Sequence, residues 1–70
     1  MEKYKIKALM ADENSQWEES FFIFKKTQTI EEAEDYVNEI ISIFNSSLRP
    51  NETPRRLIQI ISIGKIVFNS

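Results

Sequence analysis

The sequence contains neither cysteine nor histidine in its 70 residues. Without cysteine, disulfide bonds, thiolate catalysis and cysteine-ligated zinc or iron–sulfur sites are excluded, and a reducing cytoplasm is the expected compartment. Without histidine, the commonest general base and the commonest transition-metal ligand are both missing. We therefore expect this chain to have no metal site and no cofactor.

Glycine and long apolar runs are also scarce. The single glycine, Gly64, excludes a glycine-rich phosphate loop. No apolar run approaches the ~20 residues that span a bilayer, and charges interrupt the first ten residues where a signal peptide would be apolar. Adjacent acids such as Glu18 and Glu19 are expected to be solvated, not catalytic. We predict a protein that is not an enzyme and does not enter a membrane.

Length and net charge restrict the remaining possibilities. Seventy residues predict one domain, residues 1–70, near the lower size limit for a self-sufficient core. The net charge of −2 provides no overall positive field for nucleic acid.

Residues 29–46 are the only long segment with helical periodicity. Thr29 followed by Glu32 predicts a capping box at its start. The opposite face is acidic, which is typical of a solvated helix face; the alternative is a surface that imitates nucleic-acid phosphates or docks on a basic partner. The apolar face of this predicted helix comprises Ile30, Ala33, Val37, Ile40, Ile41 and Phe44.

Three other segments predict strands, at residues 4–10, 17–25 and 55–68. The first two are expected to form an antiparallel hairpin, with Met10 opposite Trp17. In the third, Gly64 predicts a bulge or bend. In the same register, Ile6 lies opposite Phe21 and Tyr4 lies opposite Ile23.

The order strand, strand, helix, strand predicts a two-layer α+β domain. A helix that packs back over the sheet makes the third strand antiparallel to the first. The expected architecture is a three-stranded antiparallel sheet of order 2-1-3, with the helix on one face. Besides the apolar helix face, the predicted core comprises Tyr4, Ile6, Ala8, Trp17, Phe21, Ile23, Ile58 and Ile60.

Residues 44–57, FNSSLRPNETPRRL, resemble a pattern in small uncharacterised proteins of bacteriophages and integrated phage-like elements. In that pattern a helix ends in Phe-Asn, and a Leu-Arg-Pro-Gly-Glu segment leads into an Arg-Arg-Leu strand start. Asn51 replaces the family's glycine, consistent with a left-handed residue in a turn after Pro50. The resemblance implies a small accessory protein in the cytoplasm of a bacterial host, and it carries no activity.

The sheet face opposite the helix is the main candidate surface. Exposed rings beside lysines are typical of an interface with a protein partner or a second copy, here a two-fold homodimer with the lysines at its rim. The alternative is a stacking platform for single-stranded nucleic acid, and a third interpretation is that lysine stems only cover the rings. The candidate residues are Lys3, Lys5, Lys7, Phe22, Phe24, Leu57 and Ile61.

A second candidate is the group of arginines around the predicted turn at Pro50. Arg49, Arg55 and Arg56 are suited to binding a phosphate or a carboxylate. The alternative is a local cluster of ion pairs with Glu52 and with the end of the helix, which favours cations.

Overall fold

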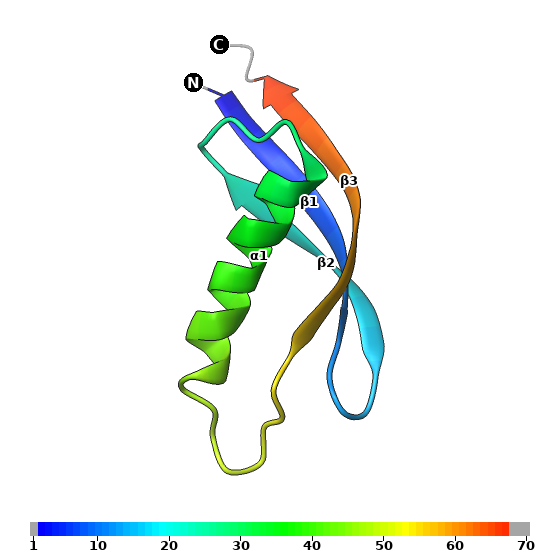
Figure 1. The fold of residues 1–70 in the computed structure, drawn as a ribbon, viewed down its shortest axis with the longest axis vertical. Helices are drawn as coiled ribbons and strands as arrows, with labels where there is room; N and C mark the ends of the chain where they lie inside the picture. The colour runs from blue at the N-terminus through cyan, green and yellow to red at the C-terminus, as the bar shows by residue number, and fades with distance from the viewer. Residues whose placement is uncertain (1, 68–70) are drawn as a thin grey trace.

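A computed structural model describes residues 2–67 as a sheet with one helix on one face (Figure 1). The elements are β1 (Glu2–Ala11), β2 (Gln16–Ile23), α1 (Ile30–Asn45) and β3 (Arg56–Val67). The sheet order is β2-β1-β3, and both pairings are antiparallel. The predicted α+β fold is therefore confirmed. Phe68, which we predicted to be part of the third strand, lies outside the described residues.

The helix begins with the predicted capping box. The backbone N–H of Glu32 donates to Thr29 Oγ1 at 3.1 Å, and the N–H of Thr29 donates to Glu32 Oε1 at 3.2 Å. Two of the N–H groups that a helix start leaves without partners are satisfied in this way. Ile30 was wrongly predicted to be buried: as the first helical residue it lies beyond the packed core and is 59% exposed.

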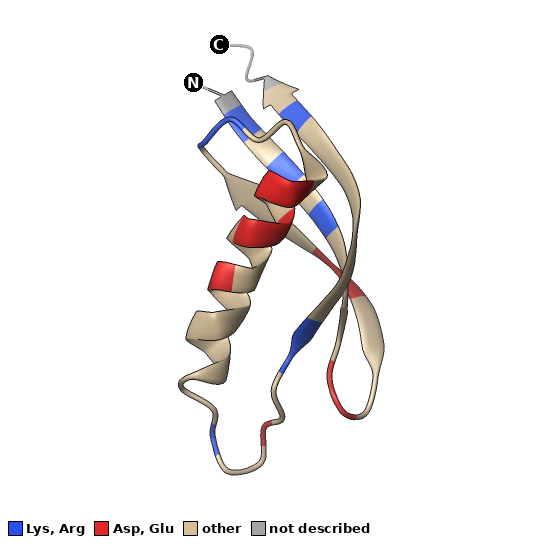
Figure 2. Ribbon diagram, viewed as in Figure 1, with Lys and Arg blue, Asp and Glu red and all other residues tan. Residues whose placement is uncertain are grey.

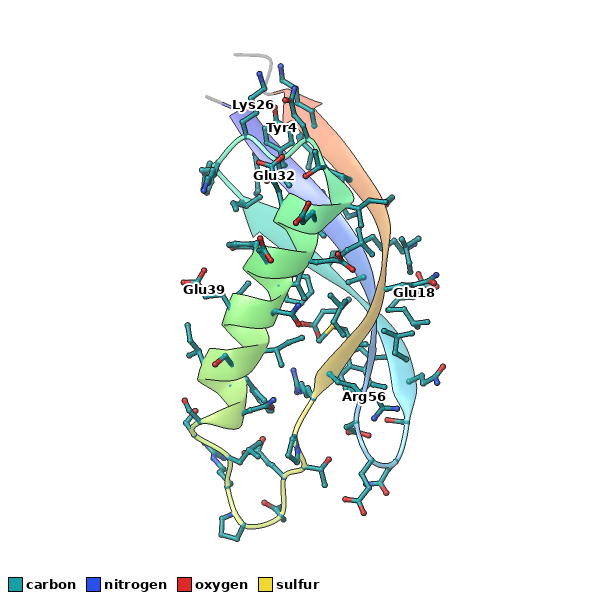
Figure 3. All side chains as sticks on the ribbon, viewed as in Figure 1. Tyr4, Glu18, Lys26, Glu32, Glu39 and Arg56 are labelled. Carbon is teal, nitrogen blue, oxygen red and sulfur yellow. The ribbon has the colours of Figure 1, made fainter. Side chains whose placement is uncertain are left out.

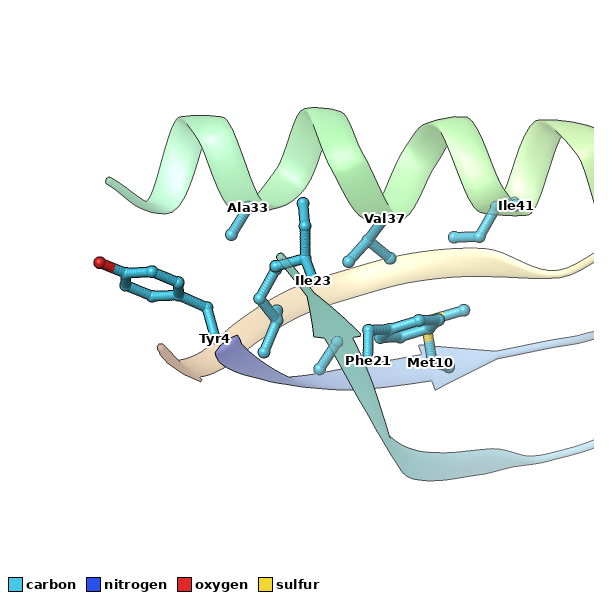
Figure 4. Close-up of a cluster of buried hydrophobic side chains, with 9 residues drawn as sticks. Tyr4, Met10, Phe21, Ile23, Ala33, Val37 and Ile41 are labelled. Carbon is cyan, nitrogen blue, oxygen red and sulfur yellow. The ribbon is translucent and has the colours of Figure 1, made fainter. Parts of the chain in front are cut away.

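The hairpin has the predicted register. Met10 pairs with Trp17, Ile6 with Phe21 and Tyr4 with Ile23. These inward-facing side chains meet the apolar face of α1 (Figure 4). The buried core consists of Tyr4, Ile6, Ala8, Met10, Phe21, Ile23, Ala33, Val37 and Ile41.

The irregularities of β3 are not at its glycine. The pairing with β1 passes over Ile61, between the partners of Lys7 and Ala8, and over Ile58, between the partners of Leu9 and Met10. Gly64 pairs with Lys5 in an uninterrupted part of the ladder. The bulge predicted at Gly64 was therefore wrong.

The two bulges decide which side chains of β3 reach the core. Each bulge adds one residue to β3. Beyond the bulge, the odd-numbered and even-numbered residues of β3 therefore exchange sides of the sheet. Leu57, Ile60 and Ile63 consequently all lie opposite inward-facing residues of β1 and pack against the core. Placing Ile58 in the core was wrong, since it is 39% exposed. Placing Leu57 on the outer face was also wrong, because Leu57 lies opposite the inward-facing Met10 and packs against the core.

The connection between α1 and β3 contains the predicted tight turn. The N–H of Glu52 donates to the carbonyl oxygen of Arg49 at 3.0 Å, so Pro50 and Asn51 form its centre. No described residue has a positive φ, so the left-handed conformation expected for Asn51 was wrong. Within residues 2–67, no helix is long and apolar enough to cross a membrane.

Candidate interaction surface

The side of the sheet that α1 leaves uncovered is here called the outer sheet face. Residues directly opposite each other in a sheet share a face, so the two registers define its members. From β1 and β2 these are Lys3, Lys5, Lys7, Leu9, Glu18, Ser20 and Phe22, and from β3 they are Gln59, Ser62, Gly64 and Ile66.

Phe22 and Phe24 form the aromatic part of this surface. Phe22 is 47% exposed, and Phe24, directly after β2, is 65% exposed. The Nζ of Lys3 lies 4.4 Å from the centre of the Phe22 ring and 5.8 Å from that of Phe24. Such cation–π contacts are worth about 0.5–1 kcal/mol at exposed sites. Lys3 covers the rings without burying them, which leaves both available to a partner.

A row of lysines runs down the middle of the outer sheet face. Lys3, Lys5 and Lys7 all come from β1, the central strand (Figure 2). A two-fold contact between two such faces would therefore place these lysines near its middle instead of at the predicted rim. The Nζ of Lys7 lies 3.0 Å from Glu18 Oε1 on β2. Glu18 is the only acid among the described residues of this face, so three lysines leave its charge positive.

The third strand contributes less to the surface than expected. Leu57 belongs to the core side, as described above. Ile61 is 41% exposed, but it occupies a bulge position and has no partner in the ladder with β1. The structure thus brings together the lysines of β1 with Phe22 of β2 and Phe24 directly after it, and it places Leu57 on the core side.

The three arginines make different contacts. The backbone N–H of Arg49 donates to Glu52 Oε1 at 3.0 Å, which stabilises the turn. Arg56 reaches in another direction, with Nη1 3.5 Å from the carbonyl oxygen of Asp12 in the hairpin turn. Arg55 lies between helix and sheet. The guanidinium groups of Arg55 and Arg56 thus have different neighbours, and anion binding by the three arginines stays a prediction.

Arg55 has a structural environment that the sequence did not indicate. Its guanidinium carbon lies 3.9 Å from the centre of the Phe44 ring and 5.4 Å from that of Trp17. Its Nη1 lies 3.9 Å from Glu19 Oε1, which also accepts from Trp17 Nε1 at 3.0 Å. This side chain fills the space where the end of α1 meets the sheet. No periodicity marks such a contact, because its partners come from two separate elements, α1 and β2.

Two shallow hollows lie away from the outer sheet face. One, of about 180 Å³, is lined by Lys25 and Lys26 on one side and by acids of α1 on the other. One of these acids is Glu32, and the hydrogen bond from the Thr29 hydroxyl holds the pKa of its carboxyl group below the ordinary value. The other hollow, of about 240 Å³, lies beside the hairpin turn. Within residues 2–67, no three acidic side chains gather closely enough to hold a metal ion.

Comparison of the chain with protein-family models, with curated proteins and with solved structures gave no match. The resemblance to small phage-encoded proteins therefore stays a prediction.

Proposed function

We propose that this chain is a small non-enzymatic binding protein that acts by protein–protein contact through its outer sheet face, with a second copy of itself as the partner. The observation that carries the proposal is the exposure of Phe22 and Phe24 on a face that the described chain does not cover. Exposed apolar patches on small domains mark interaction sites more often than not. A phage-derived origin and a bacterial cytoplasm remain part of this proposal.

The area of the outer sheet face determines how tightly we expect two copies to bind each other. Three strands ~4.8 Å apart and about eight residues long present a flat area of roughly 400 Å². Standard interfaces bury about 800 Å² per partner, and smaller ones are weak or transient. We therefore expect a dissociation constant of about 10 μM to 1 mM, equivalent to roughly 4–7 kcal/mol.

The test is size-exclusion chromatography with light scattering, at protein concentrations up to ~1 mM. The wild-type mass is expected to rise with concentration, and Phe22→Glu is expected to give a folded monomer, because it places a carboxylate in the apolar contact. Ile30→Glu is the matched control: Ile30 is similarly exposed, at 59%, but lies on α1. A wild type that stays monomeric at ~1 mM refutes self-association.

A second candidate function is binding of single-stranded nucleic acid on the same face. It is favoured by the lysine row of β1 beside the exposed Phe22 ring, because proteins that bind single strands combine positive charge with stacking aromatics. Fluorescence anisotropy with oligonucleotides at two salt concentrations tests it. Binding should weaken steeply with salt, and Phe22→Ala should cost about 1–3 kcal/mol per stacked base. Absence of binding at low salt excludes this function.

A further inference from the structure

A two-fold contact between two outer sheet faces meets an electrostatic obstacle. The lysine row lies on the central strand, so face-to-face stacking brings the row of one copy against that of the other. Among the residues of this face that the structure describes, Glu18 is the only acid, and it is already paired with Lys7 at 3.0 Å. Like charges directly opposed in an interface act against association. The outer sheet face therefore requires a partner with negative charge.

The chain itself offers such a partner on the solvent side of α1. Glu31, Asp35, Glu39 and Ile43 follow one another at intervals of four residues, and all four are exposed. Residues four apart are neighbours on a helix surface, so these four form a row that turns gradually around α1. Figure 2 shows acidic residues along the first turns of α1, and Glu39 extends from this helix on the side away from Glu18 of β2 (Figure 3). The two charged rows thus lie on opposite sides of the molecule.

The two rows match in spacing and in order. Alternate residues of a strand lie about 6.6 Å apart, and residues four apart on a helix rise about 6 Å. Set side by side in the same direction, the β1 row of Lys3, Lys5, Lys7 and Leu9 meets the α1 row of Glu31, Asp35, Glu39 and Ile43. The two rows thus correspond in sequence order, with three lysines against three acids and a leucine against an isoleucine.

The fold supplies the required direction. Within one molecule, β2 is antiparallel to β1, and α1 runs back in the direction of β1 (Figure 1). A second copy stacked by simple translation therefore has its α1 running in the same general direction as the β1 below it, with the two crossing at an angle. Such a contact joins two different surfaces, so a third copy can add in the same way.

We infer that the outer sheet face of one copy binds the acidic row of α1 on the next copy, in a head-to-tail stack. This inference rests on the proposed self-association and specifies its geometry. The mass should grow beyond that of a dimer as concentration rises. Association should also weaken as salt increases from ~0.05 to ~0.5 M, since the ion pairs are exposed to solvent.

The experiment uses two blocked variants. Phe22→Glu blocks the sheet and leaves α1 intact, whereas the double variant Asp35→Lys/Glu39→Lys blocks the helix and leaves the sheet intact. Each alone is expected to be monomeric at a concentration where the wild type associates. Their equimolar mixture should form a 1:1 complex that does not grow further, because it contains one intact surface of each kind.

Controls separate folding and net charge from geometry. Circular dichroism should show native helix content in both blocked variants. The triple variant Glu13→Lys/Asn14→Lys/Gln16→Lys changes net charge by the same amount at exposed positions of the hairpin turn and the first residue of β2, and it should associate within about threefold of the wild type. The helix-blocked variant should associate at least about tenfold more weakly.

The outcomes distinguish this inference from the proposed function. If the helix-blocked variant associates as tightly as the wild type, or if the mixture stays monomeric, the head-to-tail contact is wrong. Self-association through the outer sheet face then stands only if Phe22→Glu still abolishes it. If Phe22→Glu associates as the wild type does, both the inference and the proposed function fail.

Discussion

The side chain of Asn45, the last residue of α1, joins the helix to the start of β3. Its Oδ1 accepts from the backbone N–H of Arg55 at 2.9 Å, and its Nδ2 donates to the carbonyl oxygen of Arg55 at 3.0 Å. The amide thus takes the place of a neighbouring strand for one residue of the chain. It also closes the connection between helix and strand, so that Arg55 is held between Phe44 and Trp17.

Replacing Asn45 with alanine removes both hydrogen bonds at once. A typical intramolecular hydrogen bond contributes about 0.5–1.5 kcal/mol net, so Asn45→Ala should lower the free energy of unfolding by about 1–3 kcal/mol. A domain of this size has a total of roughly 4–10 kcal/mol. Since 1 kcal/mol moves the Tm of a small domain by about 4–8 °C, we expect a fall of roughly 5–20 °C.

Thermal unfolding followed by circular dichroism measures this effect, with Asn38→Ala as the matched control. Asn38 is an exposed asparagine of the same helix, and alanine there should be neutral or stabilising by about 0.5 kcal/mol. If Asn45→Ala melts within about 2 °C of that control, the amide does not hold helix and strand together. The account of this end of the molecule would then be wrong.

Two further predictions concern single residues. Gly64→Thr should stabilise the protein by about 0.5–1 kcal/mol in urea unfolding, because a Cβ at Gly64 would meet nothing within 4 Å and threonine suits a strand; a destabilised variant would mean that the backbone there requires glycine. The hydrogen bond from the Thr29 hydroxyl, followed by that from the N–H of Gln28, lowers the pKa of Glu32 from 4.5. Glu32 therefore contributes stability above about pH 4.5 that is lost as the pH falls through its lowered pKa. In the Glu32→Gln variant, the helix signal in circular dichroism should consequently fall less between about pH 5 and 3 than in the wild type. An unchanged pH dependence would count against the capping box.

The hairpin and the helix could be predicted because each has one buried side. In β1 and β2, a slip of one residue would expose every inward-facing side chain, so the alternation places Met10 and Trp17 on the same, buried side of the sheet. In α1, Thr29 and Glu32 mark the start, and the apolar spacing identifies the side that packs on the sheet. The pattern does not show how far along α1 the sheet covers the apolar side, and the exposure of Ile30 was missed for that reason.

The side chains of the third strand that face the core could not be predicted in the same way. Both of its sides are rich in isoleucine, so alternation no longer distinguishes the core side from the solvent side. Its faces are set by the bulges at Ile58 and Ile61, which exist only relative to the ladder with β1. Gly64 was a misleading signal, because it lies in open space within a regular part of that ladder. The environment of Arg55 was likewise unpredictable, since it depends on α1 and β2 meeting beside the residue that precedes β3.

The register of β1 and β2 is strongly specified, whereas that of β3 depends on its bulges. Substitutions on β1 and β2 are therefore the clearer tests of the outer sheet face. The positions of Lys5 and Phe22 follow from a register that is strongly specified, because shifting it would expose the core. The position of Ile61 depends on a bulge, and a substitution there can move the bulge along β3 and alter which side chains are buried. A weakened contact in an Ile61 variant would therefore have two explanations, lost contact area and a shifted strand. Substitutions on β1 and β2 change the outer sheet face while leaving the paired, inward-facing side chains in place.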